Sequence, residues 1–400
     1  MRIFRFNGEA EVYRIMHEIG VDPYGIKIML PKTSALLVRL PDVPNVLANI
    51  LKQEMLALGA DAAITRSALI DKNKKADLLL IGQGSQFGGL IKKLKAQPFG
   101  LTKLAHDLAE NLNNFSKTDF VLTFKHGSLN LKTRTRIMGI INLTPDSFSG
   151  DGLYKKSCSN SLYLALEKAQ RLVSDGADII DLGGESSRPG AKSVSVKVEL
   201  ARTIPVVKLL AKKIKIPISI DTTKFEVAKA ALDSGAQIIN DIGGLRNGKM
   251  LKVAADYQAT VVIMHMLGKP VQMQKIIRYK SLIDDILLYL KESIVSACAA
   301  GIKPEKIIVD PGLGFGKTWQ HNLEIIKYLE SFKILGKPIL FGPSRKSFIA
   351  KVVGPDVLSL ANGTLASCLL GAQQGANIVR VHEVKAVKQA LKLSEAVNKC

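Results

Sequence analysis

The sequence predicts an α/β protein, a (β/α)8 TIM barrel preceded by a smaller α/β or α+β domain. From residue 136 onward, eight short apolar runs rich in β-branched residues alternate with segments whose apolar residues recur at helical spacing. Such strands are typical of a parallel sheet covered on both faces, and eight β/α units in about 265 residues match the size of a closed barrel. Nearly every run ends in a polar or charged residue. This favours the barrel over an open doubly wound sheet, whose functional residues gather at one switch point.

The barrel strands are expected, in chain order, at residues 136–143, 177–184, 216–222, 236–242, 259–266, 306–312, 337–344 and 376–383. The helical segments between them, such as residues 161–176 and 281–301, often end at a glycine suited to a left-handed cap. Before the barrel, residues 119–132 have the pattern of a hairpin, which we expect to plug the bottom of the barrel.

Residues 1–118 form the accessory domain, of unknown role, and residues 119–400 form the barrel domain. In the accessory domain, strands are expected at residues 33–40, 61–70 and 76–82, and helices at residues 43–59 and 99–115. The glycine-rich segment 82–89 lacks the spacing of a dinucleotide-binding fingerprint and is expected to be a flexible loop.

The net charge of +21 raises the question of an anionic partner. Residues 1–120 carry +4 of this charge and residues 121–400 carry +17. Aromatic residues are few and none are interleaved with a basic cluster, so no nucleic-acid partner is expected. We expect most lysines on solvated helix faces, from which they steer anionic small molecules toward the barrel.

The cysteine spacing and the hydropathy pattern bear on location. The four cysteines are widely scattered and form neither a zinc nor a disulfide pattern, which fits a reducing compartment. The charged amino terminus and the lack of any run of roughly 18 apolar residues predict neither a signal peptide nor a membrane span. A cytoplasmic protein is therefore expected.

Polar groups at the strand ends are the candidate site, because the carboxyl ends of parallel barrel strands meet at one rim. They are Asn142, Asp181, Glu185, Asp221, Asn240, Asp241, His265, Asp310, Ser344, Arg345, Lys346, Arg380 and His382. Any single one of them could instead cap a helix or pair with a neighbour, but buried polar groups are costly, and this is improbable for the whole set.

The spacing of these groups indicates a phosphorylated substrate. Arg380 and His382 are two residues apart on one strand and so point to the same side, where they suit a phosphate. The carbonyl of Asn142 suits Mg²⁺, which commonly bridges substrate phosphates and keeps several waters. Asp221, Asn240 and Asp310 together match the hydrogen-bonding edge of a heterocycle with an amidine-like pattern.

Eight sequence runs over residues 120–400 resemble the dihydropteroate synthase family. They are MGIINLTPDSFSGDG, DLGGESSRPGA, DTTKFEVAKAAL, IINDIGG, MHMLGKPVQMQ, DPGLGFGKTWQHNLEII, GPSRKSFI and RVHEV. The resemblance implies a Mg²⁺-dependent transferase of folate biosynthesis, a target of sulfonamides. It would join 4-aminobenzoate to 6-hydroxymethyl-7,8-dihydropterin diphosphate, release pyrophosphate, and act as a homodimer.

The resemblance also implies roles for individual residues. The catalytic residues would be Asp221, Lys346, Arg380 and His382. The pterin would be held by Asp221, Asn240, Asp310 and Lys346, in a slot shaped by Ile242, Met264, Phe315, Gly342 and the stacked Arg380. The diphosphate would lie against Asn142, Arg380 and His382, with the metal on Asn142. The 4-aminobenzoate would meet Asp146, Ser147, Phe148, Ser187, Arg188, Pro189 and Ser347. Ser187 stands where the family usually has Thr.

Other interpretations are less well supported. A methyltetrahydrofolate-dependent methyltransferase uses a similar barrel but needs neither a diphosphate site nor an aminobenzoate site, and the runs NLTPDSFS, SRKS and RVH argue against it. A catalytically silent barrel with a regulatory first domain is a further alternative. The run GLGFGKT resembles a phosphate-binding loop, but Pro311 stands where that motif needs glycine. We expect His265 to make a hydrogen bond at a strand end, because this is commoner for such a histidine than ligation of a metal.

Overall fold

The computed structural model describes residues 9–71, 73–98, 100–125, 127–144, 158–186, 193–268 and 277–397. The chain forms two compact units, Met1–Leu112 and Asn113–Cys400. The division falls within helix α5 (Leu101–Ser116), a few residues before the expected boundary at residue 118.

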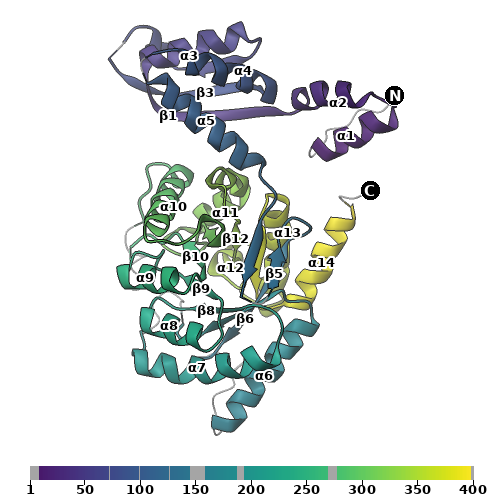
Figure 1. Cartoon of the computed structure of the whole chain (residues 1–400), viewed down its shortest axis with the longest axis vertical. Coiled ribbons are helices and arrows are strands. Elements are labelled where there is room, and N and C mark those ends of the chain that lie inside the picture. Colours follow the sequence, from purple (N-terminus) through teal and green to yellow (C-terminus); the bar gives the residue numbers. More distant parts are fainter. Residues whose placement is uncertain are drawn as a thin grey trace. The chain divides into compact units, whose positions relative to one another are not determined.

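The first unit is a small α/β fold (Figure 1). Its antiparallel sheet has the order β1 (Ala35–Pro44), β3 (Lys75–Gln83), β2 (Asp61–Ile64). Its helices are α1 (Glu9–Glu18), α2 (Pro23–Met29), α3 (Asn45–Ala57), α4 (Gly84–Lys95) and most of α5. Leu78 and Leu80 of the sheet pack with Leu51 and Met55 of α3 in one buried cluster. The strand expected at residues 61–70 ends early, at Ile64, and a 3₁₀ turn covers Arg66–Leu69.

The expected loop at residues 82–89 is wrong, because α4 begins at Gly84. The side chain of Gln86 holds the start of this helix by accepting a hydrogen bond from the backbone N–H of Gln83 at 2.8 Å. Gly89 lies against Leu58, and a Cβ atom at this position would come within 2.9 Å of Leu58 Cδ2. Glycine therefore serves close helix packing here.

The second unit is a closed parallel barrel, which confirms the (β/α)8 fold. Its strands are β6 (Arg136–Asn142), β7 (Ile179–Gly183), β8 (Ile218–Asp221), β9 (Ile238–Asp241), β10 (Thr260–Met264), β11 (Ile307–Asp310), β12 (Leu340–Phe341) and β13 (Ile378–Val381). They form one 8-stranded sheet in which β6 pairs with both β7 and β13. A parallel bridge between Val309 and Ile339 joins β11 to the start of β12 and closes the ring.

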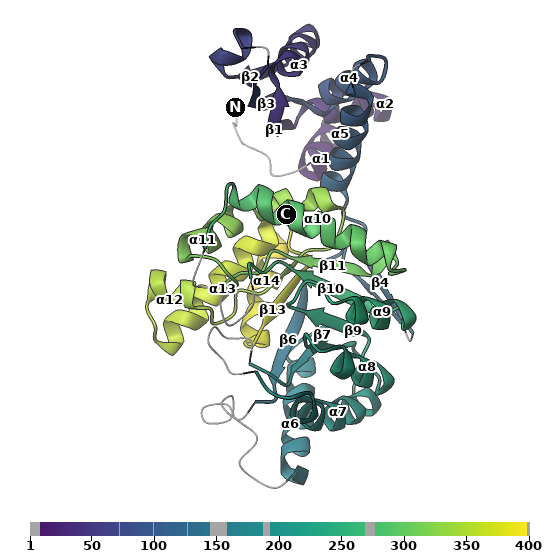
Figure 2. The ribbon, with the colours of Figure 1, turned by 90° about the vertical axis from the view of Figure 1, so that its left-hand side faces the viewer.

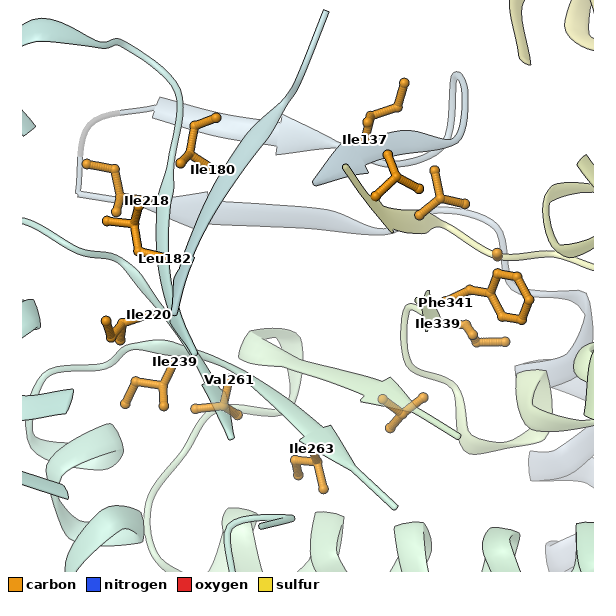
Figure 3. Close-up of a cluster of buried hydrophobic side chains, with 14 of the residues drawn as sticks. Ile137, Ile180, Leu182, Ile218, Ile220, Ile239, Val261, Ile263, Ile339 and Phe341 are labelled. Atoms are coloured by element: carbon orange, nitrogen blue, oxygen red, sulfur yellow. The ribbon is translucent and has the colours of Figure 1, made fainter. Parts of the chain in front are cut away.

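Helices surround this sheet (Figures 1 and 2). They are α6 (Cys158–Ser174), α7 (Val196–Lys213), α8 (Phe225–Asp233), α9 (Gly248–Asp256), α10 (Leu282–Ala299), α11 (Trp319–Lys327), α12 (Ser347–Val353), α13 (Val357–Gln373) and α14 (Val384–Val397). The main core lies between strands and helices, and Figure 3 shows strand residues of this layer, among them Ile180, Leu182, Ile218 and Ile220. Among the described helices, none alone has the length and apolar composition to cross a membrane, although the bent pair α12 and α13 has them when taken together.

The inside of the barrel is layered, because side chains along a strand alternate between its two faces. The lower layer is apolar and consists of Met138, Ile179, Ile238, Val262, Ile308, Leu340 and Ile378. The hairpin of β4 (Val121–Phe124) and β5 (Gly127–Asn130) adds Leu122 to this layer, and Leu131 follows from just after β5. The expected plug at the bottom of the barrel is therefore confirmed. Two residues further along the strands, the same alternation places the polar groups of the candidate site.

Candidate active site

Arg380 lies at the centre of the polar layer, two residues above the buried Ile378. Its guanidinium donates from Nε to Asp181 Oδ2 at 2.6 Å and from Nη2 to Asp221 Oδ2 at 2.8 Å. Strands β13, β7 and β8 thus bring three strand-end groups into direct contact, as the barrel geometry predicts.

Asp221 is electrostatically perturbed. Burial raises the pKa of this carboxyl to about 7, and Asp181 adds to the increase, while Arg380 acts in the opposite direction. A carboxyl with this pKa changes charge near neutral pH, so its ionisation responds to a ligand that brings positive charge or N–H donors.

Asp181 is fully buried and only partly satisfied. Its Oδ2 atom accepts from Arg380 and from Asn240 Nδ2, the latter at 3.2 Å. Its Oδ1 atom has no hydrogen-bond partner among the described residues. Because a buried carboxylate oxygen without a partner is costly, this atom indicates a place for a donor from a bound ligand.

Lys346 and Asp310 form a second part of the rim. Lys346 immediately precedes α12, donates a hydrogen bond to the carbonyl of Leu313, and lies 4.8 Å from the centre of the Phe315 ring. Burial lowers the pKa of Lys346 to about 8, although Asp310 favours its charged form. Burial likewise raises the pKa of Asp310, whose Oδ1 accepts from the backbone N–H of Gly312 at 2.7 Å.

An apolar slot borders these polar groups. Ile242, Met264 and Phe315 pack into one small cluster, which also includes Met266. Gly342 lies beside Arg380, and a Cβ atom there would stand 3.7 Å from Arg380 Cβ. Ile242, Met264 and Phe315 therefore lie together as expected, with Met266 as an addition, and Gly342 lies beside Arg380. Apolar side chains and a guanidinium are both groups that bind an aromatic ring system.

His382 lies at the rim between Asn142 and Ser344. Its Nε2 atom is 3.4 Å from Asn142 Nδ2, and its Nδ1 atom is 2.9 Å from Ser344 Oγ. The neighbouring Arg345 has a φ of 55° and donates from Nε to Glu383 Oε1 at 2.6 Å. Asn142 and His382 are thus brought together as the sequence indicates.

The expected aminobenzoate residues are described only in part. Ser347 is exposed at the first position of α12. Asp146, Ser147, Phe148, Ser187, Arg188 and Pro189 lie outside the described residues.

Comparisons with known proteins bear on the identity of this site. A family model described as "Pterin binding enzyme" matches residues 138–382. A dihydropteroate synthase from Synechocystis sp. is 46% identical over 266 residues, which are 66% of this chain and 90% of that protein. The chain belongs to the dihydropteroate synthase family.

A solved structure of this family has the same barrel. The dihydropteroate synthase of Xanthomonas albilineans with 4-aminobenzoic acid has 39% sequence identity and a TM-score of 0.65, and the match covers 71% of this chain and 100% of that one.

A longer relative matches part of the first unit too. A probable bifunctional folylpolyglutamate synthase/dihydropteroate synthase from Halobacterium salinarum is 39% identical over 350 residues, 87% of this chain and 41% of that protein. Because this match is longer than the barrel unit, it extends into the residues before the barrel.

One buried network of this synthase-family barrel was missed in the sequence. Lys224 Nζ contacts the carboxylates of both Glu185 and Glu199, and Thr222 Oγ1 donates to Glu199 Oε1 at 2.6 Å. Glu185 Oε1 in turn accepts from the backbone N–H of Val194 at 3.1 Å. The network therefore ties Glu185 and Val194 together, on the two sides of the segment that carries Ser187, Arg188 and Pro189. The sequence offered only a lysine three residues after the strand-end Asp221, which does not by itself identify the partners of that lysine.

A second missed residue is Lys317, at the end of the GLGFGK run. Its Nζ lies 2.8 Å from His265 Nδ1 and donates to the Phe315 carbonyl at 3.1 Å. Burial lowers the pKa of His265 to about 2 and that of Lys317 well below its usual value. The expected hydrogen-bonded role of His265 is confirmed, and the buried Lys317 is turned into the protein rather than toward a nucleotide.

Proposed function

We propose that this chain condenses 6-hydroxymethyl-7,8-dihydropterin diphosphate with 4-aminobenzoate to give 7,8-dihydropteroate and pyrophosphate. The observation that carries this proposal is the pairing of Arg380 with Asp181 and Asp221 beside the apolar slot, in a chain of the dihydropteroate synthase family. The buried Asp181 oxygen that has no partner among the described residues, and the carboxyls of Asp221 and Asp310, are acceptors for the N–H groups of the pterin.

The reaction separates charge, and the rim residues stabilise both parts. When the carbon–oxygen bond to the diphosphate breaks, positive charge spreads into the pterin ring, and ionised Asp221 lies where it stabilises that charge. Arg380 and His382 receive the negative charge that develops on the diphosphate. The amine nitrogen of 4-aminobenzoate then attacks the exocyclic carbon and loses a proton to water. No covalent intermediate with the protein is required.

Lys346 serves as a pterin-binding group in this scheme. Its ammonium lies over the Phe315 ring, and the negative charge of Asp310 favours its charged form. Although burial lowers its pKa to about 8, the group is still mostly charged at neutral pH and can donate to a pterin oxygen or nitrogen. The exposed Ser347 next to it is assigned to the carboxylate of 4-aminobenzoate.

Mg²⁺ is assigned to the diphosphate. Mg²⁺ usually keeps several waters and is bound through substrate phosphates, so phosphate and water oxygens would supply most of its ligands. Asn142 directs its amide nitrogen toward His382, which leaves its amide oxygen for the cation. When bound, Mg²⁺ supplies charge neutralisation for the departing pyrophosphate.

Turnover tests the proposal. The purified chain is incubated with the dihydropterin diphosphate, 4-aminobenzoate and Mg²⁺, and pyrophosphate release is followed. We expect release that requires both organic substrates, and a loss of at least about a hundredfold in Asp221→Ala, since charge-stabilising groups commonly contribute that much. Absence of product at high enzyme concentration would overturn the assignment.

A homodimer and a cytoplasmic location belong to the same proposal, on the basis of the family resemblance. Light scattering coupled to size-exclusion chromatography tests the homodimer, which requires twice the chain mass of 43.4 kDa. Cell fractionation tests the location, and recovery of the chain in the membrane fraction would contradict it.

A further inference from the structure

We propose that the barrel unit has a second anion site, for a small oligophosphate, at the end of the barrel opposite to Arg380. A cavity of about 260 Å³ opens there. The residues around it that carry charge are Lys117, Lys132, Arg134, Lys333, Lys337 and Glu395. Thr135 and Asn377, which also line it, directly precede β6 and β13, so the cavity lies at the amino ends of the strands.

Two of the five cations are already neutralised. Lys132 pairs with Asp119 at 2.7 Å, and Arg134 Nη1 donates to Asp178 Oδ2 at 2.8 Å. The carboxylates of Asp119 and Asp178 are therefore already paired with these two cations. Glu395 is the one acidic residue in the lining of the cavity.

The other three lysines have neutral partners. Lys117 Nζ lies 5.1 Å from the centre of the Phe120 ring, and Lys333 Nζ lies 4.6 Å from the centre of the Phe115 ring. Lys337 Nζ donates to the Pro304 carbonyl at 2.8 Å. Within the part of the chain that the structure describes, none of the three makes an ion pair with a carboxylate.

Burial makes this arrangement costly without an anion. Lys333 and Lys337 are partly buried, and burial lowers the pKa of both, an effect that Lys117 increases for Lys337. Glu330 opposes this decrease only partly for Lys333, and Cys298 and Glu305 oppose it only partly for Lys337. An anion in the cavity would favour the charged form of all three ammonium groups.

The chemistry favours phosphate. Three ammonium groups act as point charges and match the several negative charges of a diphosphate or triphosphate, which is a common use of lysine. A volume of about 260 Å³ admits such a group with some water. The site also gives a local role to part of the basic excess of residues 121–400.

Calorimetric titration of the full-length protein with inorganic tripolyphosphate tests the proposal, with citrate as the carboxylate probe. Lys333→Met with Lys337→Met removes two of the charges and keeps the apolar stems. Lys212→Met with Lys213→Met is the matched control, because these exposed lysines at the end of α7 lie outside the cavity lining. Lys117→Gln with Lys333→Gln removes charge from a different part of the cavity wall and guards against a folding defect in the first pair.

On the proposed function, the rim also binds phosphate, so we expect two classes of tripolyphosphate site in the wild type; a single class that the cavity variants lose would leave the cavity site standing and count against the rim. In both cavity variants, the affinity of one class of site for tripolyphosphate should fall at least tenfold. Both variants should keep wild-type turnover. The control pair should keep both classes, and citrate should bind the cavity more weakly than tripolyphosphate. Binding by both cavity variants within twofold of the wild type would overturn the proposal, and equal binding of citrate would overturn the assignment to phosphate.

Discussion

Replacing Asp221 by Asn tests the electrostatics of the rim, because the change removes a charge and nearly preserves the shape of the side chain. Burial raises the pKa of Asp221 from 3.8 to about 7, even though Arg380 favours the ionised form. The unfolded chain therefore releases this proton at lower pH than the folded chain. It follows that the stability contributed by the protonated carboxyl is fully present below about pH 4 and is lost as the pH rises to 7.

The magnitude follows from the shift. About three pKa units at ~1.4 kcal/mol each correspond to about 4 kcal/mol in total. The Asp221 side chain is only 11% exposed, so solvent screening reduces this value little. Between pH 5 and pH 8, the free energy of unfolding of the wild type should therefore fall by about 3 kcal/mol relative to that of Asp221→Asn.

Urea unfolding at several pH values measures this difference. The single tryptophan, Trp319, lies at the start of α11 and reports on the barrel unit. The titrating groups distant from Asp221 are common to both proteins and cancel in the comparison. Asp221→Asn should also lower kcat by about a hundredfold, because its amide cannot stabilise positive charge on the pterin. Stability curves of the two proteins that run parallel from pH 5 to pH 8 would refute the reasoning.

Three further changes test other parts of the structure. Lys346→Met should weaken pterin binding at least tenfold in calorimetry, since it removes the ammonium beside Asp310. Lys224→Met should lower the free energy of unfolding by about 3 kcal/mol, because it leaves the fully buried Glu199 without its cation. Leu122→Ala should cost about 3 kcal/mol in urea unfolding, because its fully buried side chain seals the bottom of the barrel.

Each change has a matched control. Lys351 is exposed on α12, the short helix that Lys346 precedes, and Lys351→Met should leave pterin binding unchanged. Lys229→Met breaks an exposed pair with Asp233 and should change stability by less than about 1 kcal/mol. Val121→Ala, next to Leu122 but 44% exposed, should cost under about 1 kcal/mol. Equal effects of a change and its control would contradict the role given to the buried residue.

The barrel strands were predictable because their pattern is local. Buried parallel strands are continuously apolar, and the polar residues at their ends fall on one rim whatever the details of packing. The ion pairs of Arg380 with Asp181 and Asp221 required only that strands β13, β7 and β8 share that rim.

Other features depend on packing between distant segments. The helix after Gly84 was missed because glycines usually indicate loops, whereas Gly89 here permits close contact with Leu58. Nothing near Lys224 in the sequence shows that its partners are Glu185 and Glu199, since those contacts join separate β/α units. The burial of Lys317 against His265 likewise depends on how the loop after β11 folds back.

The central claim is that the polar layer around Arg380 is the pterin site. A crystal structure of the protein with the dihydropterin diphosphate tests it most directly. The account predicts the pterin ring beside Met264 and Phe315, with its N–H groups on the carboxylates of Asp181, Asp221 or Asp310 and the diphosphate against His382. A pterin bound elsewhere, with the pairs of Arg380 left undisturbed and the polar layer empty, would contradict it.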